Sequence, residues 1–376
     1  MEINWISPIM SPSGYANVNR NLVVAFVKLG VTVNLKNQKT WDVLTIADFH
    51  ISQKDILESC LTNKFNLKYP VVYYTTPHNW NKLKVEGSKY DIVGSMFEVD
   101  RVPQEWVEVS KKVKEFWIPS IFNLETYYHS GIDVSKLHVM PLGVDTEFYQ
   151  PIPPRTVIKN KRTFSFILLS QWTYRKGFDV LIKAFVEEFK SKEDVCLIIK
   201  TYQANYSERC NDIVRKELVG YVGNNPHAPI LLWLGQLTPG EIRSFYNTGS
   251  CFVMPTRGEG WNLPLAEAMA CEIPTIVTNW SAHKMFATNK TSYLIDYKLV
   301  DTDSNKLSWI FGGYKNSFCA EPDKEHLKKL MRYVYTHQDE AKQKAVVGRQ
   351  ALQEHFTWEK AAKNIIHRLG EIQCMI

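Results

Sequence analysis

Apolar and polar positions alternate along the first part of the chain in two different patterns. An apolar run at residues 3–6 predicts a short strand, and the polar segment 7–17, which contains two prolines and a glycine, predicts a loop. Apolar residues then recur with the spacing of one helical face over residues 18–29, and a second strand is predicted at 31–35. A strand, a helix and a further strand in this order indicate a parallel sheet with right-handed crossovers.

The same alternation continues to the end of the chain. Further strands are predicted at residues 71–74, 92–97, 116–119, 164–169, 195–199, 230–234, 250–254 and 275–278. Helices are predicted at 180–189, 241–246, 263–270 and, with an amphipathic stripe, at 358–369. Three prolines within residues 150–155 are typical of a linker. We therefore expect two doubly wound, Rossmann-like α/β domains facing a cleft, at 1–150 and 151–355, and a C-terminal helical segment at 356–376.

Composition places the chain among globular proteins. It has 376 residues, of which 45% are hydrophobic and 22% charged, and its apolar runs are shorter than the roughly 20 residues of a transmembrane segment. Residues 1–150 hold 15 basic and 16 acidic side chains, whereas the whole chain carries a net charge of +6, so the second part is basic. A basic domain suits an anionic ligand such as a nucleotide, although a solvated basic surface explains the charge equally well.

The cysteines and the N-terminal residues indicate the cellular compartment of the protein. The seven cysteines are scattered and form no Cys-x-x-Cys pair, which favours a reducing compartment and argues against a zinc site. No basic region followed by an apolar block opens the sequence, so we expect a cytoplasmic protein without a secretory signal. The frequent use of Asn, Lys and Tyr fits an AT-rich genome, bacterial or viral.

The richest chemistry lies at residues 255–270, after the strand predicted at 250–254. The turn contains two glycines, and Pro264 occupies a favoured first position of the following helix, whose open N–H groups suit an anion or a hydroxyl. Glu259 and Glu267 are eight positions apart, so that two carboxylates could bracket a polyhydroxylated ligand. A tight strand-to-helix turn with Glu267 exposed on its helix is the structural alternative.

The order of residues in this block resembles a known family. Glu259-Gly260-x-x-Leu263-Pro264-x-x-Glu267 is similar to the E-x7-E signature of retaining GT-B glycosyltransferases, and family 4 ("glycosyl transferases group 1") is the most similar group. Residues 141–149, 174–185 and 235–246 resemble further blocks of that family in the same order. Residues 356–359 resemble the start of its C-terminal helix, which crosses back to the first domain. The resemblance implies the GT-B fold.

The resemblance also implies roles for particular residues. It implies that Glu267 accepts hydrogen bonds from the ribose, that Glu259 holds the transferred sugar, and that Lys176, with Arg175, neutralises the leaving diphosphate. The donor-binding residues that it implies are Gly14, Gln171, Arg175, Lys176, Glu259, Gly260, Trp261, Asn262, Leu263 and Glu267. Gln171 stands where the family has an arginine, so either Arg175 substitutes or phosphate binding is weaker. Trp261 replaces a phenylalanine and either packs on the donor or lines the core.

Two residues of the first domain are candidates for activating the acceptor. His78 follows a segment that is similar to a strand of the family that is followed by a histidine. In this sequence the histidine comes two positions later than in the family. Glu98 lies in the segment 92–107, which resembles a subgroup in which a glutamate ends the strand. We favour Glu98. The alternative for His78 is an ordinary histidine without a role in the reaction, and the alternative for Glu98 is a structural ion-pair partner. The leaving diphosphate could also take the acceptor proton.

The resemblance thus implies a retaining hexosyltransferase that uses a nucleotide-diphosphate sugar, most simply a UDP- or GDP-sugar, and we expect no cofactor or essential metal. The triplet Asp301-Thr302-Asp303 matches a metal motif of another glycosyltransferase fold, which we attribute to chance. Motifs of nicotinamide-binding and P-loop enzymes are absent from the sequence. The acceptor stays open among a glycan, a polysaccharide, a lipid-linked sugar, a protein and a modified nucleobase in nucleic acid. The alternatives are a non-catalytic scaffold of the same fold and a sugar-nucleotide epimerase.

Overall fold

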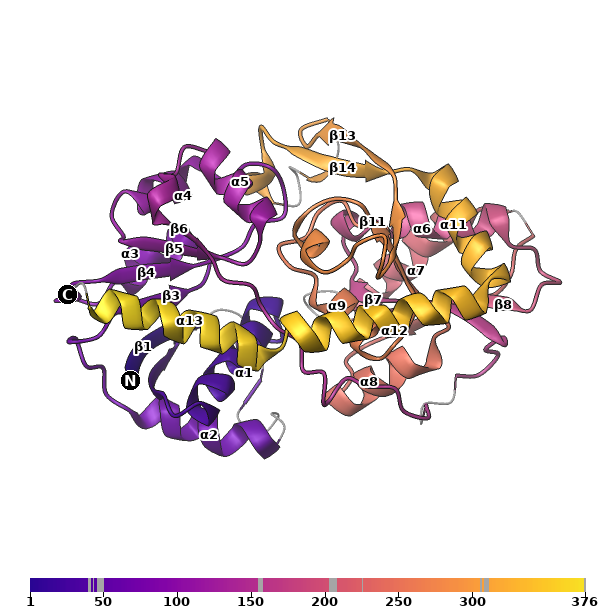
Figure 1. Ribbon diagram of the computed structural model, residues 1–376. Helices are drawn as coiled ribbons and strands as arrows, with labels where there is room; N and C mark the ends of the chain where they lie inside the picture. The colour runs from indigo at the N-terminus through magenta and orange to yellow at the C-terminus, as the bar shows by residue number, and fades with distance from the viewer. Residues whose placement is uncertain are drawn as a thin grey trace. The chain divides into compact units, whose positions relative to one another are not determined.

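The computed structural model describes residues 1–39, 42, 44–45, 51–154, 158–202, 208–224, 226–304, 306–307 and 311–374. The chain forms two compact units, one made of Met1–Gly143 and His355–Ile376 and the other of Val144–Glu354. Each unit contains a six-stranded sheet whose strand pairs are parallel and which is flanked by helices (Figure 1). The prediction of two Rossmann-like α/β domains is confirmed.

The first unit has the strand order β2-β1-β3-β4-β5-β6. Its strands are β1 (Glu2–Ser7), β2 (Thr32–Asn37), β3 (Val71–Tyr74), β4 (Asp91–Gly94), β5 (Glu115–Ile118) and β6 (Leu137–Val139). Its helices are α1 (Gly14–Lys28), α2 (Ile51–Thr62), α3 (Trp80–Leu83), α4 (Gln104–Ser110), α5 (Ile121–His129) and α13 (Trp358–Gln373), with 3₁₀ turns η2 (Pro77–Asn79) and η3 (Val134–Lys136). β3, β4 and β5 are buried along their whole length, as expected of parallel strands covered on both faces.

Helix α1 begins earlier than the sequence suggested. The segment 7–17 was expected to be a loop throughout, which is wrong for its last part because the helix starts at Gly14. The Ser13 hydroxyl accepts a hydrogen bond from the Ala16 N–H at 3.2 Å and so caps the first turn. The helix start was missed because the first turn is polar: it is stabilised by the Ser13 cap and has no apolar spacing that a sequence pattern would show.

Helix α13 is part of the first unit. It buries Ala361, Ile365 and Leu369, and the Arg368 guanidinium donates to the buried Glu115 carboxylate of β5 at 2.7 Å. The chain passes close to the start of this helix at Gly143, where a Cβ atom would lie 2.4 Å from the Trp358 nitrogen. Only glycine fits at this crossing.

The second unit has the strand order β12-β11-β10-β7-β8-β9. These strands are β7 (Phe164–Gln171), β8 (Val195–Tyr202), β9 (Ile230–Leu234), β10 (Cys251–Met254), β11 (Thr275–Thr278) and β12 (Tyr293–Ile295), and an antiparallel pair, β13 (Tyr297–Asp301) and β14 (Phe318–Pro322), is attached. The helices are α6 (Phe178–Glu188), α7 (Glu208–Val222), α8 (Pro239–Thr248), α9 (Leu263–Ala270), α11 (Lys324–Thr336) and α12 (Gln338–His355), with 3₁₀ turns η4 (Tyr174–Lys176), η5 (Ala282–Met285) and η6 (Gly312–Tyr314). β7 and β10 lie side by side in this sheet.

The division between the units lies seven residues before the boundary predicted at 150. The proline-rich segment belongs to the second unit. The Ile152 N–H donates to the Asn247 side chain of α8 at 3.0 Å, and the Asn247 amide donates to the Gln150 carbonyl at 3.2 Å. These bonds hold this part of the segment on the second unit, whereas a proline count by itself predicts a free linker.

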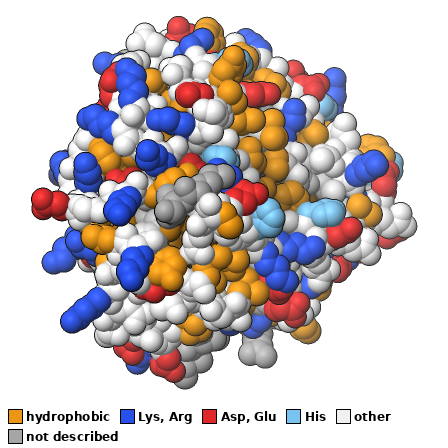
Figure 2. Space-filling view, turned by 60° about the vertical axis from the view of Figure 1, so that its left-hand side comes forward, with side chains coloured by type: hydrophobic (Ala, Val, Ile, Leu, Met, Phe, Trp, Pro, Cys, Tyr) orange, Lys and Arg blue, Asp and Glu red, His pale blue; other side chains and the backbone are white. Residues whose placement is uncertain are grey.

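Charged side chains of both signs are interspersed with apolar ones on the face of the molecule shown in Figure 2. In the part of the chain that the structure describes, we find no helix whose length and hydrophobicity would allow it to span a bilayer.

Candidate functional site

The segments that follow β7 and β10 meet at one edge of the second sheet. Because β7 and β10 are parallel neighbours, their carboxyl ends lie at the same edge, where open α/β sheets bind ligands. The Arg257 N–H donates to the Arg175 carbonyl at 2.7 Å, which joins η4 to the turn after β10. Gly177 has φ +71°, and a Cβ atom there would lie 1.9 Å from the Pro255 carbonyl oxygen. Glycine is therefore required for this close approach.

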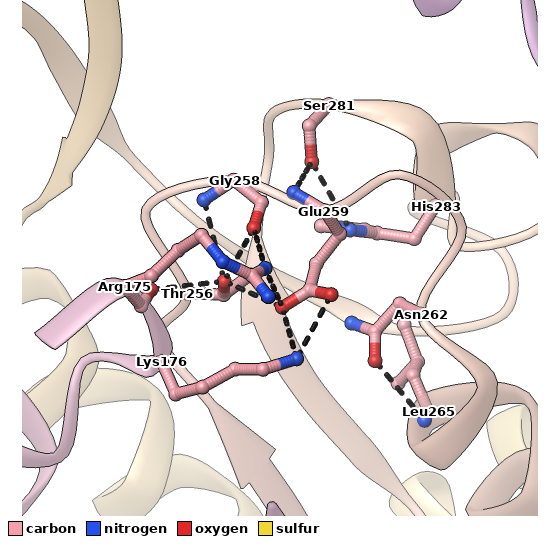
Figure 3. Close-up of polar contacts among 9 residues, drawn as sticks. All are labelled: Arg175, Lys176, Thr256, Gly258, Glu259, Asn262, Leu265, Ser281 and His283. Carbon is pink, nitrogen blue, oxygen red and sulfur yellow. Dashed lines mark hydrogen bonds and ion pairs between the residues drawn. The ribbon is translucent and has the colours of Figure 1, made fainter. Parts of the chain in front are cut away.

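Glu259 is the centre of a buried charged cluster (Figure 3). The Lys176 ammonium donates to both of its carboxylate oxygens, at 2.8 and 3.0 Å, and the Thr256 hydroxyl donates to one of them at 2.8 Å. The Arg175 guanidinium lies 3.2 Å from the same oxygen. Burial by itself would raise the pKa of Glu259, but the two cations outweigh it and lower the pKa to about 2. The carboxylate is charged at neutral pH.

The main chain of Glu259 is held from the side of β11. Its N–H donates to the Ser281 hydroxyl at 3.0 Å. His283 lies two residues further on, fully buried, with Nε2 2.7 Å from the Thr278 carbonyl oxygen. Burial lowers the pKa of His283, so the ring is neutral at pH 7. Sequence reasoning missed Ser281 and His283, although both follow a predicted strand at the same edge of the sheet.

The turn ends with Asn262, which has φ +82° and directly precedes α9. Its side-chain oxygen accepts from the Leu265 N–H at 3.3 Å, so Asn262 is the N-cap. Gly260 and Trp261 precede it and are buried, and the Trp261 ring packs against Phe286 at 5.3 Å between centroids. Trp261 thus lies in the core of the unit, and its contact with the donor stays a prediction.

Glu267 is also buried, so the alternative of an exposed helix glutamate is wrong. The Tyr246 hydroxyl of α8 donates to its carboxylate at 2.8 Å, and the Tyr149 hydroxyl is a second partner. Burial raises the pKa of Glu267 to about 7, even though the two tyrosine bonds stabilise the ionised form. Glu259 and Glu267 therefore differ in kind: the first is a permanent anion, whereas the second gains or loses a proton near neutrality.

The raised pKa of Glu267 predicts a specific dependence of stability on pH. In the unfolded chain the group has a pKa near its ordinary value of 4.5, so between 4.5 and 7 the folded state binds the proton more strongly. Stability should then fall as pH rises through this window. Because Glu267→Gln does not titrate, its free energy of unfolding relative to the native protein should increase by about 3 kcal/mol between pH 4.5 and pH 8. Urea unfolding of both proteins at the two pH values measures this difference, and parallel pH profiles would contradict it.

Arg257 was not singled out by the sequence, yet it ties three segments together. Its guanidinium donates to Asp179 of α6 at 2.9 Å and to Glu321 of β14 at 2.8 Å, and it stacks on the Tyr174 ring at 3.7 Å. Burial opposes its charge, but the two carboxylates raise the pKa of Arg257 further above its ordinary value. Arg257 fixes the turn that carries Glu259 against η4, which carries Lys176.

The remaining donor candidate of this unit, Gln171, is half-buried at the end of β7, opposite Tyr202 of β8. It therefore lies at the same edge of the sheet as η4. Leu263 is the first residue of α9. The structure thus brings Arg175, Lys176 and Glu259 into direct contact and places Glu267 within the helix that follows.

The candidates of the first unit follow the carboxyl ends of β1, β3 and β4. Gly14 is the first residue of α1, and the neighbouring Tyr15 hydroxyl lies 2.9 Å from the Ser95 hydroxyl after β4. Glu98 is half-buried three residues further on. Burial raises the pKa of Tyr15, and the Glu98 charge adds to this effect. His78 lies in η2 after β3, with Nε2 3.4 Å from the Thr76 hydroxyl. The assignment of Glu98 or His78 as a base stays a prediction.

Asp301 and Asp303 form a turn at the end of β13. The Asp303 N–H donates to the Asp301 carboxylate at 2.7 Å, and the Asn316 N–H donates to the Asp303 carboxylate at 2.9 Å. Both carboxylates therefore accept local main-chain hydrogen bonds. Within the described residues, no three His, Cys, Asp or Glu side chains are grouped as metal ligands would be.

The chain is similar to known proteins both in sequence and in fold. Residues 163–308, which include the Glu259 cluster, match the model of the family described as glycosyl transferases group 1. Over its whole length the chain superposes on sucrose-phosphate synthase from Thermosynechococcus elongatus, with a TM-score of 0.72, 14% sequence identity and 100% coverage of both chains. The fold is GT-B. A second GT-B structure, Anabaena Alr3699/HepE in complex with UDP-glucose, superposes with a TM-score of 0.70 at 11% identity, covering 99% of this chain and 100% of that one.

Curated relatives are distant and only partly covered. The chain is 24% identical over 173 residues to mannosylfructose-phosphate synthase of Agrobacterium fabrum. The matched segment covers 42% of this chain and 37% of the relative. It is 22% identical over 257 residues to alpha-maltose-1-phosphate synthase of Mycolicibacterium smegmatis, covering 65% of this chain and 58% of the relative. The matched segments therefore span less than two thirds of the length of either relative.

Proposed function

We propose that this GT-B protein is a retaining glycosyltransferase that moves a hexose from a nucleotide-diphosphate sugar to an acceptor. The observation that carries the proposal is the buried Glu259 carboxylate, held ionised by Lys176 and Arg175 in the turn before α9. Family similarity over residues 163–308 supports it, because that segment contains the whole cluster. A UDP-sugar is the first donor to test, since UDP-glucose is bound in one of the structural relatives.

In the proposed reaction the cluster has two tasks. Glu259 accepts hydrogen bonds from the sugar, and Lys176 and Arg175 stabilise the charge that develops on the leaving diphosphate. Glu267 accepts hydrogen bonds from the ribose; donation by ribose hydroxyls favours the ionised carboxylate and so lowers its pKa. The bond between the anomeric carbon and the diphosphate oxygen breaks with its electron pair on the diphosphate, and the acceptor oxygen bonds to the anomeric carbon on the same face. The acceptor proton goes to the diphosphate or to Glu98.

Donor binding and donor hydrolysis test the proposal. Purified protein is incubated with UDP-, GDP-, ADP- and dTDP-sugars, and released nucleotide is measured beside the melting temperature. At a nucleotide concentration 100 times Kd, binding should stabilise the protein by about 2.7 kcal/mol. Release from one donor, lost in Glu267→Ala, is the expected result, and NMR of the product should show the anomeric configuration of the donor. If no nucleotide changed the melting temperature, a non-catalytic GT-B protein, with Gln171 as the altered phosphate contact, would be the better description.

A further inference from the structure

Asn262 carries a polar group that the proposed reaction has not yet used. Its side-chain oxygen caps α9 by accepting from the Leu265 N–H at 3.3 Å. This bond fixes which end of the carboxamide is oxygen and which is nitrogen, because the opposite assignment would place two donors against each other. The Nδ2 amide group therefore has a defined direction.

That direction is towards the Glu259 cluster. In Figure 3 the Asn262 amide nitrogen points to the side where the Glu259 carboxylate and the Lys176 ammonium meet. Asn262 is only 4% exposed, and Nδ2 has no hydrogen-bond partner among the residues that the structure describes. A buried donor without a partner destabilises a protein, so one that is held in place by a cap calls for a ligand.

The chemistry of the neighbours indicates which ligand group would fit. Nδ2 can only donate, and the adjacent Glu259 carboxylate can only accept. A hydroxyl group satisfies both, since it accepts from the amide and donates to the carboxylate. An ionised phosphate oxygen would satisfy the amide but has no hydrogen to donate to the Glu259 carboxylate.

We propose that the Asn262 amide donates a hydrogen bond to a hydroxyl oxygen of the transferred sugar, and that Asn262 selects donors that carry this hydroxyl. This inference rests on the proposed function and adds a specificity-determining residue to it. At φ +82° the position favours Gly, Asn or Asp, and glycine would suit the backbone best. The presence of Asn262 therefore indicates that its side chain has a role of its own.

The variants that test Asn262 are the two other residues that tolerate its positive φ angle, glycine and aspartate. Asn262→Gly keeps the φ angle and removes the carboxamide, whereas Asn262→Asp keeps the capping oxygen and replaces only the donor. A matched control is Thr238→Gly, which removes the side-chain cap of α8 at an exposed position. All three proteins are checked by thermal unfolding, and Asn262→Asp is used if Asn262→Gly does not fold.

The experiment compares the donor with its deoxy analogues. For the donor found by the hydrolysis screen, kcat/KM should fall about tenfold in Asn262→Gly and stay within about twofold in Thr238→Gly. Native protein should discriminate against one deoxy-sugar donor by a similar factor, and Asn262→Gly should lose that discrimination. The Kd of the nucleoside diphosphate without sugar should be the same in native protein and Asn262→Gly.

Two results would overturn the inference. Equal loss of affinity for the nucleoside diphosphate alone would place the contact on phosphate. Unchanged discrimination among all deoxy donors in Asn262→Gly would show that the amide contacts no sugar hydroxyl. Either result presupposes that the native protein turns over a donor, so both are distinct from a failure of the proposed function, in which the native protein neither binds nor turns over any donor.

Discussion

Glu259→Gln is expected to lower kcat/KM for sugar transfer by about 10²- to 10³-fold. The substitution keeps the shape of the side chain but removes the charge that Lys176 and Arg175 hold in place, with contacts at 2.8 and 3.2 Å. A neutral amide is a weaker acceptor for a sugar hydroxyl and leaves the two cations without their buried counter-charge. Because the cations still face the diphosphate, nucleoside diphosphate should bind at least as tightly as in the native protein.

Steady-state kinetics with the preferred donor, together with calorimetric titration of the nucleoside diphosphate, measures both effects. Glu325→Gln is the matched control, because Glu325 is a surface carboxylate paired with Lys328 at 2.9 Å in the same unit. It should leave both quantities unchanged. Full activity of a folded Glu259→Gln protein would refute the role of Glu259 in the reaction.

Arg257→Met should lower the free energy of unfolding by about 3 kcal/mol. The Arg257 side chain is 1% exposed and ion-paired to Asp179 and Glu321, which are 16% and 28% exposed. Its removal leaves two partly buried carboxylates close together without a cation, and methionine fills much of the volume. The loss should therefore come from the unpaired charges rather than from a cavity.

Arg332→Met provides the comparison for Arg257→Met. Arg332 also bridges two carboxylates, Glu188 at 2.7 Å and Glu193 at 2.5 Å, but its side chain is 34% exposed. Solvent screening predicts a loss below about 1 kcal/mol at this position. Chemical denaturation of the three proteins at pH 7 measures the difference, and equal losses for the two variants would show that burial does not decide the effect.

Agreement between sequence and structure is best for elements that form a largely apolar run. The strands at 71–74, 230–234 and 275–278 and the helix at 263–270 have the bounds that their apolar runs predicted. The pair β13 and β14 was not predicted, because both strands are short and β13 is largely exposed, so that neither forms an apolar run. Helix α12 was also missed, since only four of its 18 residues are buried: Ala341, Ala345, Gly348 and Leu352.

In the site, the sequence by itself determined which residue types occur at which spacing: Glu259 and Glu267 around a glycine turn, and Lys176 after a strand. Only the tertiary structure decided their states. Glu259 has its pKa lowered because Lys176, 83 positions away in sequence, lies 2.8 Å from it, whereas Glu267 has its pKa raised because no cation among the described residues offsets its burial.

The residues that hold the site in place were likewise beyond the reach of sequence patterns. Arg257, Ser281 and Tyr246 act through partners that are distant in sequence, and their partners are brought near only when β7, β10 and β11 align in one sheet. Periodicity reports the burial of a segment, which is a local property of the chain. Charge state and hydrogen bonding depend on distances of a few ångströms between segments, and only the folded chain sets these distances.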